Sequence, residues 1–127
     1  MPTQIGVDVF DISRMQRAID ADNNIYWHSV FTDAELQQGW QSGDACRFFA
    51  CRFALKEAAF KALNTQWNEQ MEWHMIETTG QEYTAPGVVY HGPFGEIARQ
   101  KGVVHSSASL SSDANLAFAA VVLTLQT

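Results

Sequence analysis

The residues with the clearest chemical potential lie close together in the middle of the chain. Four of the eight basic residues in this 127-residue sequence fall within positions 47–61, and Glu57 is the one acidic residue among them. The basic residues are Arg47, Arg52, Lys56 and Lys61. Because the whole chain carries a formal net charge of -6, a local basic segment suits a compact anionic ligand better than a long polyanion.

A long helix over residues 44–64 is expected to carry these side chains. Asp44 is a suitable N-cap, alanine is abundant, and no glycine or proline interrupts the segment. On a helical projection, Arg52 and Lys56 fall inside the apolar arc. Two interpretations stay open: these cations meet a specific partner, or their stems pack while their charged ends reach water.

Glu57 and Lys61 are four residues apart, so a helix places them side by side on one face. This pair also has two interpretations. It is either part of a reactive site or an exposed ion pair that contributes only about 0.3–0.5 kcal/mol to stability.

The elements before this helix must position any partner groups. Residues 4–13 alternate apolar and polar types and predict a strand that ends near Asp11, with Ile5, Val7 and Val9 inside. A short helix is expected over residues 14–22. Further along, Thr32 and Glu35 have the spacing of a capping box, which predicts the start of another short helix.

The second half of the chain reads as strands and one helix. Strands are expected over 71–77 and 86–91, a helix over 93–101 closed by Gly102, and two strands that end the chain. The final strands cover residues 103–110 and 115–125, and the last of them is apolar enough to be a buried central strand. The sequence therefore predicts one α+β domain over residues 1–127, with a small antiparallel sheet packed on one long helix.

Composition narrows the classes of function. A net charge of -6 argues against a nucleic-acid partner. We find no apolar run long enough to span a membrane and no basic, apolar leader at the start of the sequence. The two cysteines, Cys46 and Cys51, match no metal or redox spacing and are expected to be free and at least half-buried. A reducing cytoplasm is the expected compartment.

Four segments together resemble the holo-acyl-carrier-protein synthase family of 4'-phosphopantetheinyl transferases. They are IGVDVFDISRM near the start, FTDAEL at 31–36, RFFACRFALKEAAFKALNT at 47–65 and ASLSSDANLAFAAVVL at 108–123. The third segment is similar to the family's signature helix and is the specific part of the match. The resemblance covers nearly the whole chain, and it implies a homotrimer with sites between subunits.

The resemblance implies a reaction and a metal. Family members move the phosphopantetheine arm of coenzyme A to a serine of an apo acyl carrier protein and release adenosine 3',5'-bisphosphate. Asp8 and Glu57 fall on the two carboxylates that hold Mg²⁺, and Lys61 falls on the lysine beside the reacting pyrophosphate. Mg²⁺ commonly takes one or two carboxylates together with water and phosphate oxygens, so these residue types suit it.

The resemblance also implies a set of binding residues, all named by their positions in this sequence. The coenzyme A side of the site would comprise Arg52, Lys56, Lys61, Thr65, Pro86 and Ser109. Arg14 falls on an arginine that meets the acidic carrier protein.

Three positions depart from the family pattern. Ser112 stands where a histidine is usual, residues 64–66 replace a G-T-G turn, and residues 84–86 replace G-K-P. Asn64 is expected to preserve the turn because asparagine tolerates the left-handed region. Three explanations remain open: a transferase for an unusual carrier protein, a slow enzyme, or a catalytically impaired relative that binds coenzyme A or a carrier protein as a scaffold.

Overall fold

A three-stranded antiparallel sheet packs against one long helix in this computed structural model, which describes residues 1–21, 24–81 and 84–127. The elements in chain order are β1 (Thr3–Asp11), α1 (Ile12–Ala21), α2 (Asn24–Val30), α3 (Asp33–Gln41), α4 (Ala45–Leu63), the 3-10 helix η1 (Trp73–Met75), β2 (Ile76–Thr79), β3 (Gly87–Tyr90), α5 (Gly92–Lys101), β4 (Val103–Asp113) and β5 (Leu116–Leu125). The expected α+β class is confirmed. No helix among the described residues is long and apolar enough to cross a bilayer.

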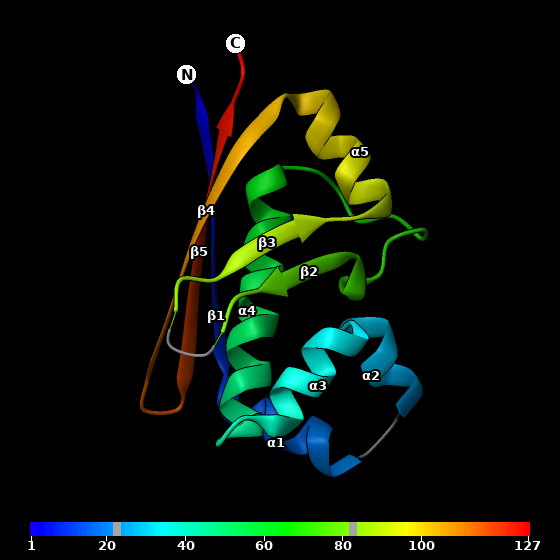
Figure 1. Ribbon diagram of the computed structural model, residues 1–127, viewed down its shortest axis with the longest axis vertical. Helices are drawn as coiled ribbons and strands as arrows, with labels where there is room; N and C mark the ends of the chain where they lie inside the picture. Colours follow the sequence, from blue (N-terminus) through cyan, green and yellow to red (C-terminus); the bar gives the residue numbers. More distant parts are fainter. Residues whose placement is uncertain (22–23, 82–83) are drawn as a thin grey trace.

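The strand order in the larger sheet is β1-β5-β4, so the last strand of the chain is the central one. Figure 1 shows α4 running along one face of this sheet, with β2 and β3 forming a second small sheet beside it. The helices α1, α2 and α3 gather at one end of α4, and α5 lies at the other. The buried core surrounds α4: the inner faces of β1 and β5 cover one side of the helix, and apolar residues of α2, α3, β2 and α5 pack elsewhere around it.

The long helix begins and ends as its sequence predicts. The Asp44 side chain accepts a hydrogen bond from the backbone N–H of Arg47, and Asn64 ends the helix with φ 55° and ψ 52°. Asn64 therefore provides the left-handed turn in place of glycine. The ammonium group of Lys101 donates to the carbonyls of Leu63 and Asn64, which supports the carbonyl end of the helix.

The predicted orientation of the first strand is wrong. Ile5, Val7 and Val9 are 56–66% exposed, whereas Asp8 and Phe10 face α4 and are buried. Alternation shows only that a strand has two faces, and packing decides which one is covered. Here α4 covers the face with Gly6, because a residue without a side chain lets the helix approach closely.

Two boundaries also differ from expectation. Residues 73–75 form a 3-10 turn, and the strand predicted over 71–77 begins only at Ile76. The first helix begins at Ile12 and its described part ends at Ala21, so position 22 of the predicted 14–22 helix lies outside the described residues. The capping box of Thr32 and Glu35 is confirmed in full.

Candidate active site

Asp8 lies where the first strand crosses the long helix. Its carboxylate is 8% exposed and faces α4, where Lys61 Nζ donates to Asp8 Oδ1 across 2.9 Å. The ammonium end of Lys61 is half exposed, and its hydrogen bond to Asp8 raises the pKa of Lys61. Two interpretations were open for Glu57 and Lys61: a reactive site or an exposed ion pair between them. In the structure the ion pair of Lys61 is formed with Asp8 of β1.

Gly6 sets the distance between β1 and α4 at this point. A Cβ atom on Gly6 would lie 2.0 Å from the backbone oxygen of Ala58 and 2.5 Å from the backbone nitrogen of Ala62. Both contacts are with helix backbone, which cannot rotate away. The close crossing therefore positions Asp8, two residues further along β1, against Glu57 and Lys61.

Gly6→Ala is expected to lower the free energy of unfolding by about 2–3 kcal/mol, because the added carbon must push β1 away from α4. Urea titration followed by circular dichroism measures this change. Gly43→Ala is the matched control, since a Cβ there meets nothing within 4 Å. Equal stability of the two variants would contradict the close-approach argument.

Glu57 lies on α4 beside Asp8 and is about half-buried. Burial, followed by a hydrogen bond to Asp8 and the negative charge of that residue, raises the pKa of Glu57 to about 7. Two neighbouring carboxylates cannot both ionise without an electrostatic cost. The pair therefore favours a proton or another cation between its members.

The chemistry of this pair fits a small hard cation. Asp8 Oδ2 is buried, and when Glu57 is ionised none of the described residues donates a hydrogen bond to it. The described residues contain no cluster of three or more histidine, cysteine, aspartate or glutamate side chains arranged for a metal ion. A cation at this place would thus take two protein carboxylates and obtain its remaining oxygens elsewhere, which is a pattern typical of Mg²⁺.

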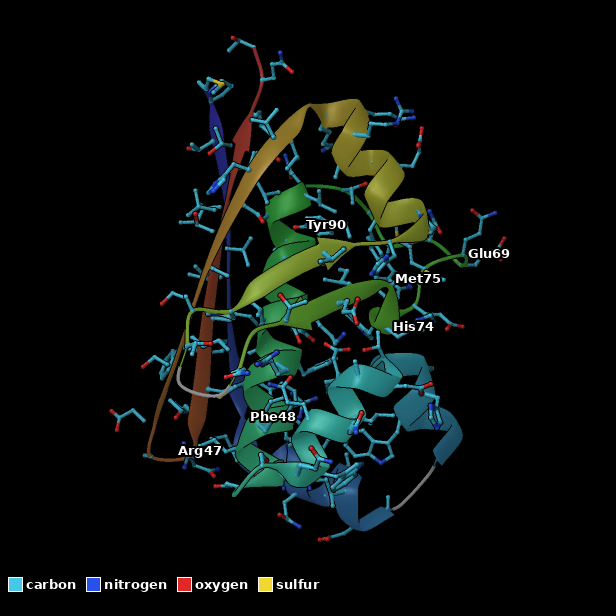
Figure 2. The ribbon with its side chains drawn as sticks, in the orientation of Figure 1. Arg47, Phe48, Glu69, His74, Met75 and Tyr90 are labelled. Carbon is cyan, nitrogen blue, oxygen red and sulfur yellow. The ribbon has the colours of Figure 1, made fainter. Side chains whose placement is uncertain are left out.

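A second feature is a cavity of about 430 Å³ between the start of α4, the β2–β3 connection and the end of β4. Its lining combines two arginines and one aspartate with neutral polar and apolar groups: Asp44, Arg47, Phe48, Cys51, Arg52, Gln81, Thr84, Pro86, Leu110, Ser111 and Ser112. Figure 2 shows Arg47 and Phe48 at the start of α4, near the β4–β5 turn. We call this space the cationic cavity.

Two arginines give the cationic cavity its charge. Arg47 Nη1 donates to Ser112 Oγ across 2.6 Å, so the serine at the histidine position of the family pattern holds an arginine at the rim. Arg52 stacks over the Phe48 ring at 4.7 Å. The role of Arg47 could not be predicted from a local pattern, because its partner Ser112 lies 65 positions away.

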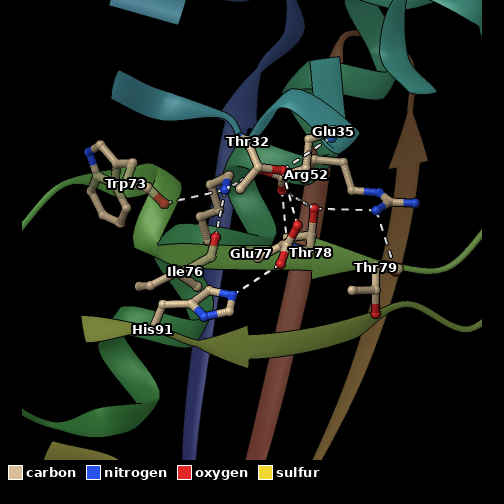
Figure 3. A network of polar contacts seen from close by, with 10 residues as sticks. Thr32, Glu35, Arg52, Trp73, Ile76, Glu77, Thr78, Thr79 and His91 are labelled. Atoms are coloured by element: carbon tan, nitrogen blue, oxygen red, sulfur yellow. Dashed lines mark hydrogen bonds and ion pairs between the residues drawn. The ribbon is translucent and has the colours of Figure 1, made fainter. Parts of the chain in front are cut away.

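Lys56 lies elsewhere, in the protein interior. It is fully buried, and its ammonium group donates to Glu35 Oε1 at 2.8 Å and to the carbonyls of Trp73 and Ile76 (Figure 3). Burial lowers the pKa of Lys56, and Glu35 opposes that shift. The snorkelling interpretation is therefore wrong for Lys56. No surface of this side chain is open to a ligand, in contrast to the coenzyme-binding role predicted for it.

The other sequence-predicted residues are dispersed. Pro86 lines the cationic cavity. Thr65 is half-buried just beyond the end of α4, and Ser109 is exposed on β4. Arg14 is exposed on α1 and lies over the Phe10 ring at 5.0 Å.

A smaller cavity of about 190 Å³ opens beside Glu57 on the α1 side of the helix. Its walls are mainly apolar, with Arg14 and Glu57 as the charged members: Phe10, Arg14, Met15, Ala18, Trp27, Val30, Phe31, Phe53 and Glu57. This apolar cavity and the carboxylate pair share one side of α4.

The cationic cavity and the carboxylate pair lie on opposite sides of α4. Phe48 and Glu57 are nine positions apart, which is about two and a half helical turns. In the sheet, the carboxylate pair borders β1 and the cavity borders β4, the two outer strands. One protomer therefore presents two separate regions, one beside each outer strand of the sheet.

Comparison with known proteins places these features in a family. Residues 4–120 match the model of the 4'-phosphopantetheinyl transferase superfamily. A holo-[acyl-carrier-protein] synthase of Geotalea daltonii is 36% identical over 118 residues, which cover 93% of this chain and 94% of the relative.

Solved structures agree with this match. The holo-[acyl-carrier-protein] synthase of Neisseria meningitidis has a TM-score of 0.81 at 26% identity, covering 95% of this chain and 97% of that one. The Helicobacter pylori enzyme, solved in complex with coenzyme A, has a TM-score of 0.78 at 25% identity, with 94% and 99% coverage.

Proposed function

The chain belongs to the holo-acyl-carrier-protein synthase family of 4'-phosphopantetheinyl transferases, and from this premise we propose that it transfers the phosphopantetheine arm of coenzyme A to a serine of an apo acyl carrier protein. The observation that carries the proposal is the group Asp8, Glu57 and Lys61, in which two carboxylates and an ammonium ion meet where β1 crosses α4. The carrier-modification assay described below tests it.

We assign Asp8 and Glu57 to a Mg²⁺ ion, because Asp8 Oδ2 is buried and, with Glu57 ionised, receives no hydrogen bond from the described residues. When bound, the ion would neutralise charge on the pyrophosphate of coenzyme A. Buried carboxylates that have an oxygen without a hydrogen bond are suitable ligands for the ion. Water and phosphate oxygens would fill its remaining coordination positions.

Lys61 is proposed to act on the leaving group. The carrier serine attacks the phosphorus that bears the pantetheine arm and gives up its hydroxyl proton to water, and the bond to the adenosine 3',5'-bisphosphate breaks. The exposed ammonium of Lys61 donates a hydrogen bond to the departing phosphate as its negative charge grows. The raised pKa of Lys61 keeps this group protonated at neutral pH.

We propose that the adenosine bisphosphate end of coenzyme A occupies the cationic cavity, with Arg47 and Arg52 near its phosphate and Pro86 beside the adenine. Thr65 and Ser109 keep their proposed places on the coenzyme side. Because Ser109 lies on the exposed sheet face, its contact would come from a neighbouring subunit. Lys56 is not included among the ligand contacts.

The separation of these two regions supports a homotrimer in which the cationic cavity of one subunit meets the carboxylate pair of the next. The outer face of the sheet offers a surface for such contact. Its exposed apolar residues are Ile5, Val7, Val9, Val104, Leu116 and Phe118. Soluble monomers rarely expose large apolar patches, so such a patch indicates an interaction surface.

Val7→Lys is expected to convert the assembly to folded monomers and to lower transfer at least about a hundredfold, because a lysine cannot be buried unpaired in an apolar interface. Sedimentation velocity and the transfer assay measure the two effects. Val89→Lys, at an exposed position of β3, is the matched control. A trimer that persists in Val7→Lys would contradict this interface.

The carrier protein is proposed to dock beside α1. Arg14 offers a positive charge to an acidic partner, and the apolar cavity beside it offers a place for a non-polar side chain. This side of α4 also holds Glu57 and Lys61, so the carrier serine would arrive at the reacting phosphate. The free, half-buried cysteines are compatible with the reducing cytoplasm that we propose as the compartment.

The function is tested by incubating the protein with coenzyme A, Mg²⁺ and apo acyl carrier proteins, and by measuring the mass of each carrier protein by mass spectrometry. The expected result is a mass gain of one phosphopantetheinyl unit that disappears with EDTA and returns with Mg²⁺. Coenzyme A binding by calorimetry without any transfer would indicate a scaffold instead. Absence of both binding and transfer would reject the proposal.

A further inference from the structure

A buried polar network links the short helix α3 to α4 and β2 (Figure 3). Its centre is the ion pair between Glu35, 1% exposed, and Lys56, 0% exposed. Buried ion pairs are costly to form, because both charges leave water. Such a pair calls for an explanation beyond stability.

Both carboxylate oxygens of Glu35 and the ammonium group of Lys56 are fully hydrogen-bonded. Glu35 Oε1 accepts from Lys56 Nζ and from the backbone N–H of Thr32, each across 2.8 Å. Glu35 Oε2 accepts from the backbone N–H of Thr78 at 2.9 Å and from its hydroxyl at 2.5 Å. Lys56 also donates to the carbonyl of Ile76 at 2.5 Å. The pair thus holds the start and middle of β2 against α4.

The network continues from Thr78 into the cationic cavity. Arg52 Nη1 donates to Thr78 Oγ1 at 3.2 Å and to the Thr79 carbonyl at 3.3 Å, and Arg52 Nη2 donates to the Gly80 carbonyl at 2.7 Å. Gln38 of α3 donates to the same Gly80 carbonyl at 2.7 Å. These contacts fix a cavity arginine and the point where the β2–β3 connection leaves the strand.

We propose that Glu35 and Lys56 are positioning residues for coenzyme A binding, an inference that rests on the proposed function. They touch no ligand themselves. They orient Thr78, which aligns the Arg52 guanidinium, and they anchor the β2–β3 connection whose members Gln81, Thr84 and Pro86 form one wall of the cationic cavity. Coenzyme A binding requires this wall to stay in place, because a displacement of about one ångström can weaken binding strongly.

Thr78→Val is the sharpest test, because it removes the hydroxyl that joins Glu35 to Arg52 while it keeps the volume and the backbone bond to Glu35. The expected result is a KM for coenzyme A raised about tenfold with kcat changed less than about threefold, since Asp8, Glu57 and Lys61 lie on the other side of α4. Thr78→Ser, which restores the hydroxyl, is expected to recover most of the affinity. Thr79→Val makes the same change at the next, exposed side chain and is the matched control.

A second measurement does not depend on catalysis. Cys51 lines the cationic cavity, and burial raises the pKa of its thiol. In a Cys46→Ser background, Thr78→Val is expected to increase the alkylation rate of Cys51 at least about threefold at fixed pH, because the loosened wall admits the reagent. Mass spectrometry follows the reaction.

The outcomes separate this inference from the proposed function. If the wild-type trimer modifies carriers and Thr78→Val matches Thr79→Val in both KM and Cys51 alkylation, the positioning role is overturned and the transferase function stands. If the wild type neither binds coenzyme A nor modifies a carrier, the proposed function fails, and the alkylation rates alone decide whether the network holds the cavity wall. A fall in kcat with unchanged KM would also overturn the inference.

Discussion

Replacing Glu57 by glutamine is expected to lower phosphopantetheine transfer by about a thousandfold or more, the largest loss that we predict for a single side chain. Glutamine keeps the shape of the residue but removes one of the two carboxylates assigned to Mg²⁺. The carrier-mass assay at saturating coenzyme A measures this loss. Glu69→Gln makes the same change in the exposed connection after α4, at the edge of the molecule in Figure 2, and is expected to be fully active.

The same variant is expected to fold at least as stably as the wild type when metal is removed. The pKa of Glu57 is about 7 in the folded protein, against an ordinary value of 4.5. The folded state therefore binds this proton more tightly, and the stability that it contributes is lost as the pH rises from 4.5 to 7. Glutamine does not titrate, so thermal unfolding in EDTA at pH 8 should show an equal or higher midpoint. A large drop in that midpoint would indicate that Glu57 is a structural residue instead.

In the proposed trimer, mixing two impaired variants is expected to restore transfer, because each subunit would contribute its two regions to different sites. Glu57→Gln removes the carboxylate half, and Arg47→Glu reverses a charge in the cationic cavity. We expect Arg47→Glu alone to lower kcat/KM for coenzyme A by about a hundredfold. Neither change removes a side chain that is fully buried.

In a head-to-tail trimer formed from equal amounts of the two chains, every mixed assembly has one site with both halves intact. Statistical mixing after co-refolding predicts about a quarter of the wild-type activity. The control is the same pair of proteins mixed as preformed trimers, which should remain inactive if exchange is slow. Activity no higher than the mean of the two variants after co-refolding would mean that each site belongs to one chain.

The central helix and its surroundings were predictable because local signals suffice for them. Asp44 and Asn64 end α4, and Thr32 with Glu35 forms the capping box, since each depends on groups within a few positions. The apolar run of residues 115–125 likewise indicated the central strand. These features follow from backbone geometry and nearby hydrogen bonds, which a sequence displays directly.

The candidate site could be predicted only in part from local sequence patterns. The helical spacing of Glu57 and Lys61 was visible, but the partner of Lys61 is Asp8, 53 positions away. The Arg47–Ser112 contact spans 65 positions. Such pairs depend on how the strands and the helix cross, which no local pattern records.

The sequence by itself determined which chemical groups this protein has, how they are spaced along α4, and through its motifs the family to which the chain belongs. Only the tertiary structure decided their surroundings. It buried Lys56 with Glu35 inside the protein, turned Val7 and its apolar neighbours outward, and placed the cationic cavity beside β4 while Asp8 lies on β1. The reason is physical: a periodic pattern defines the faces of an element, whereas the elements that pack against it determine which face is buried, which is exposed and which becomes a site.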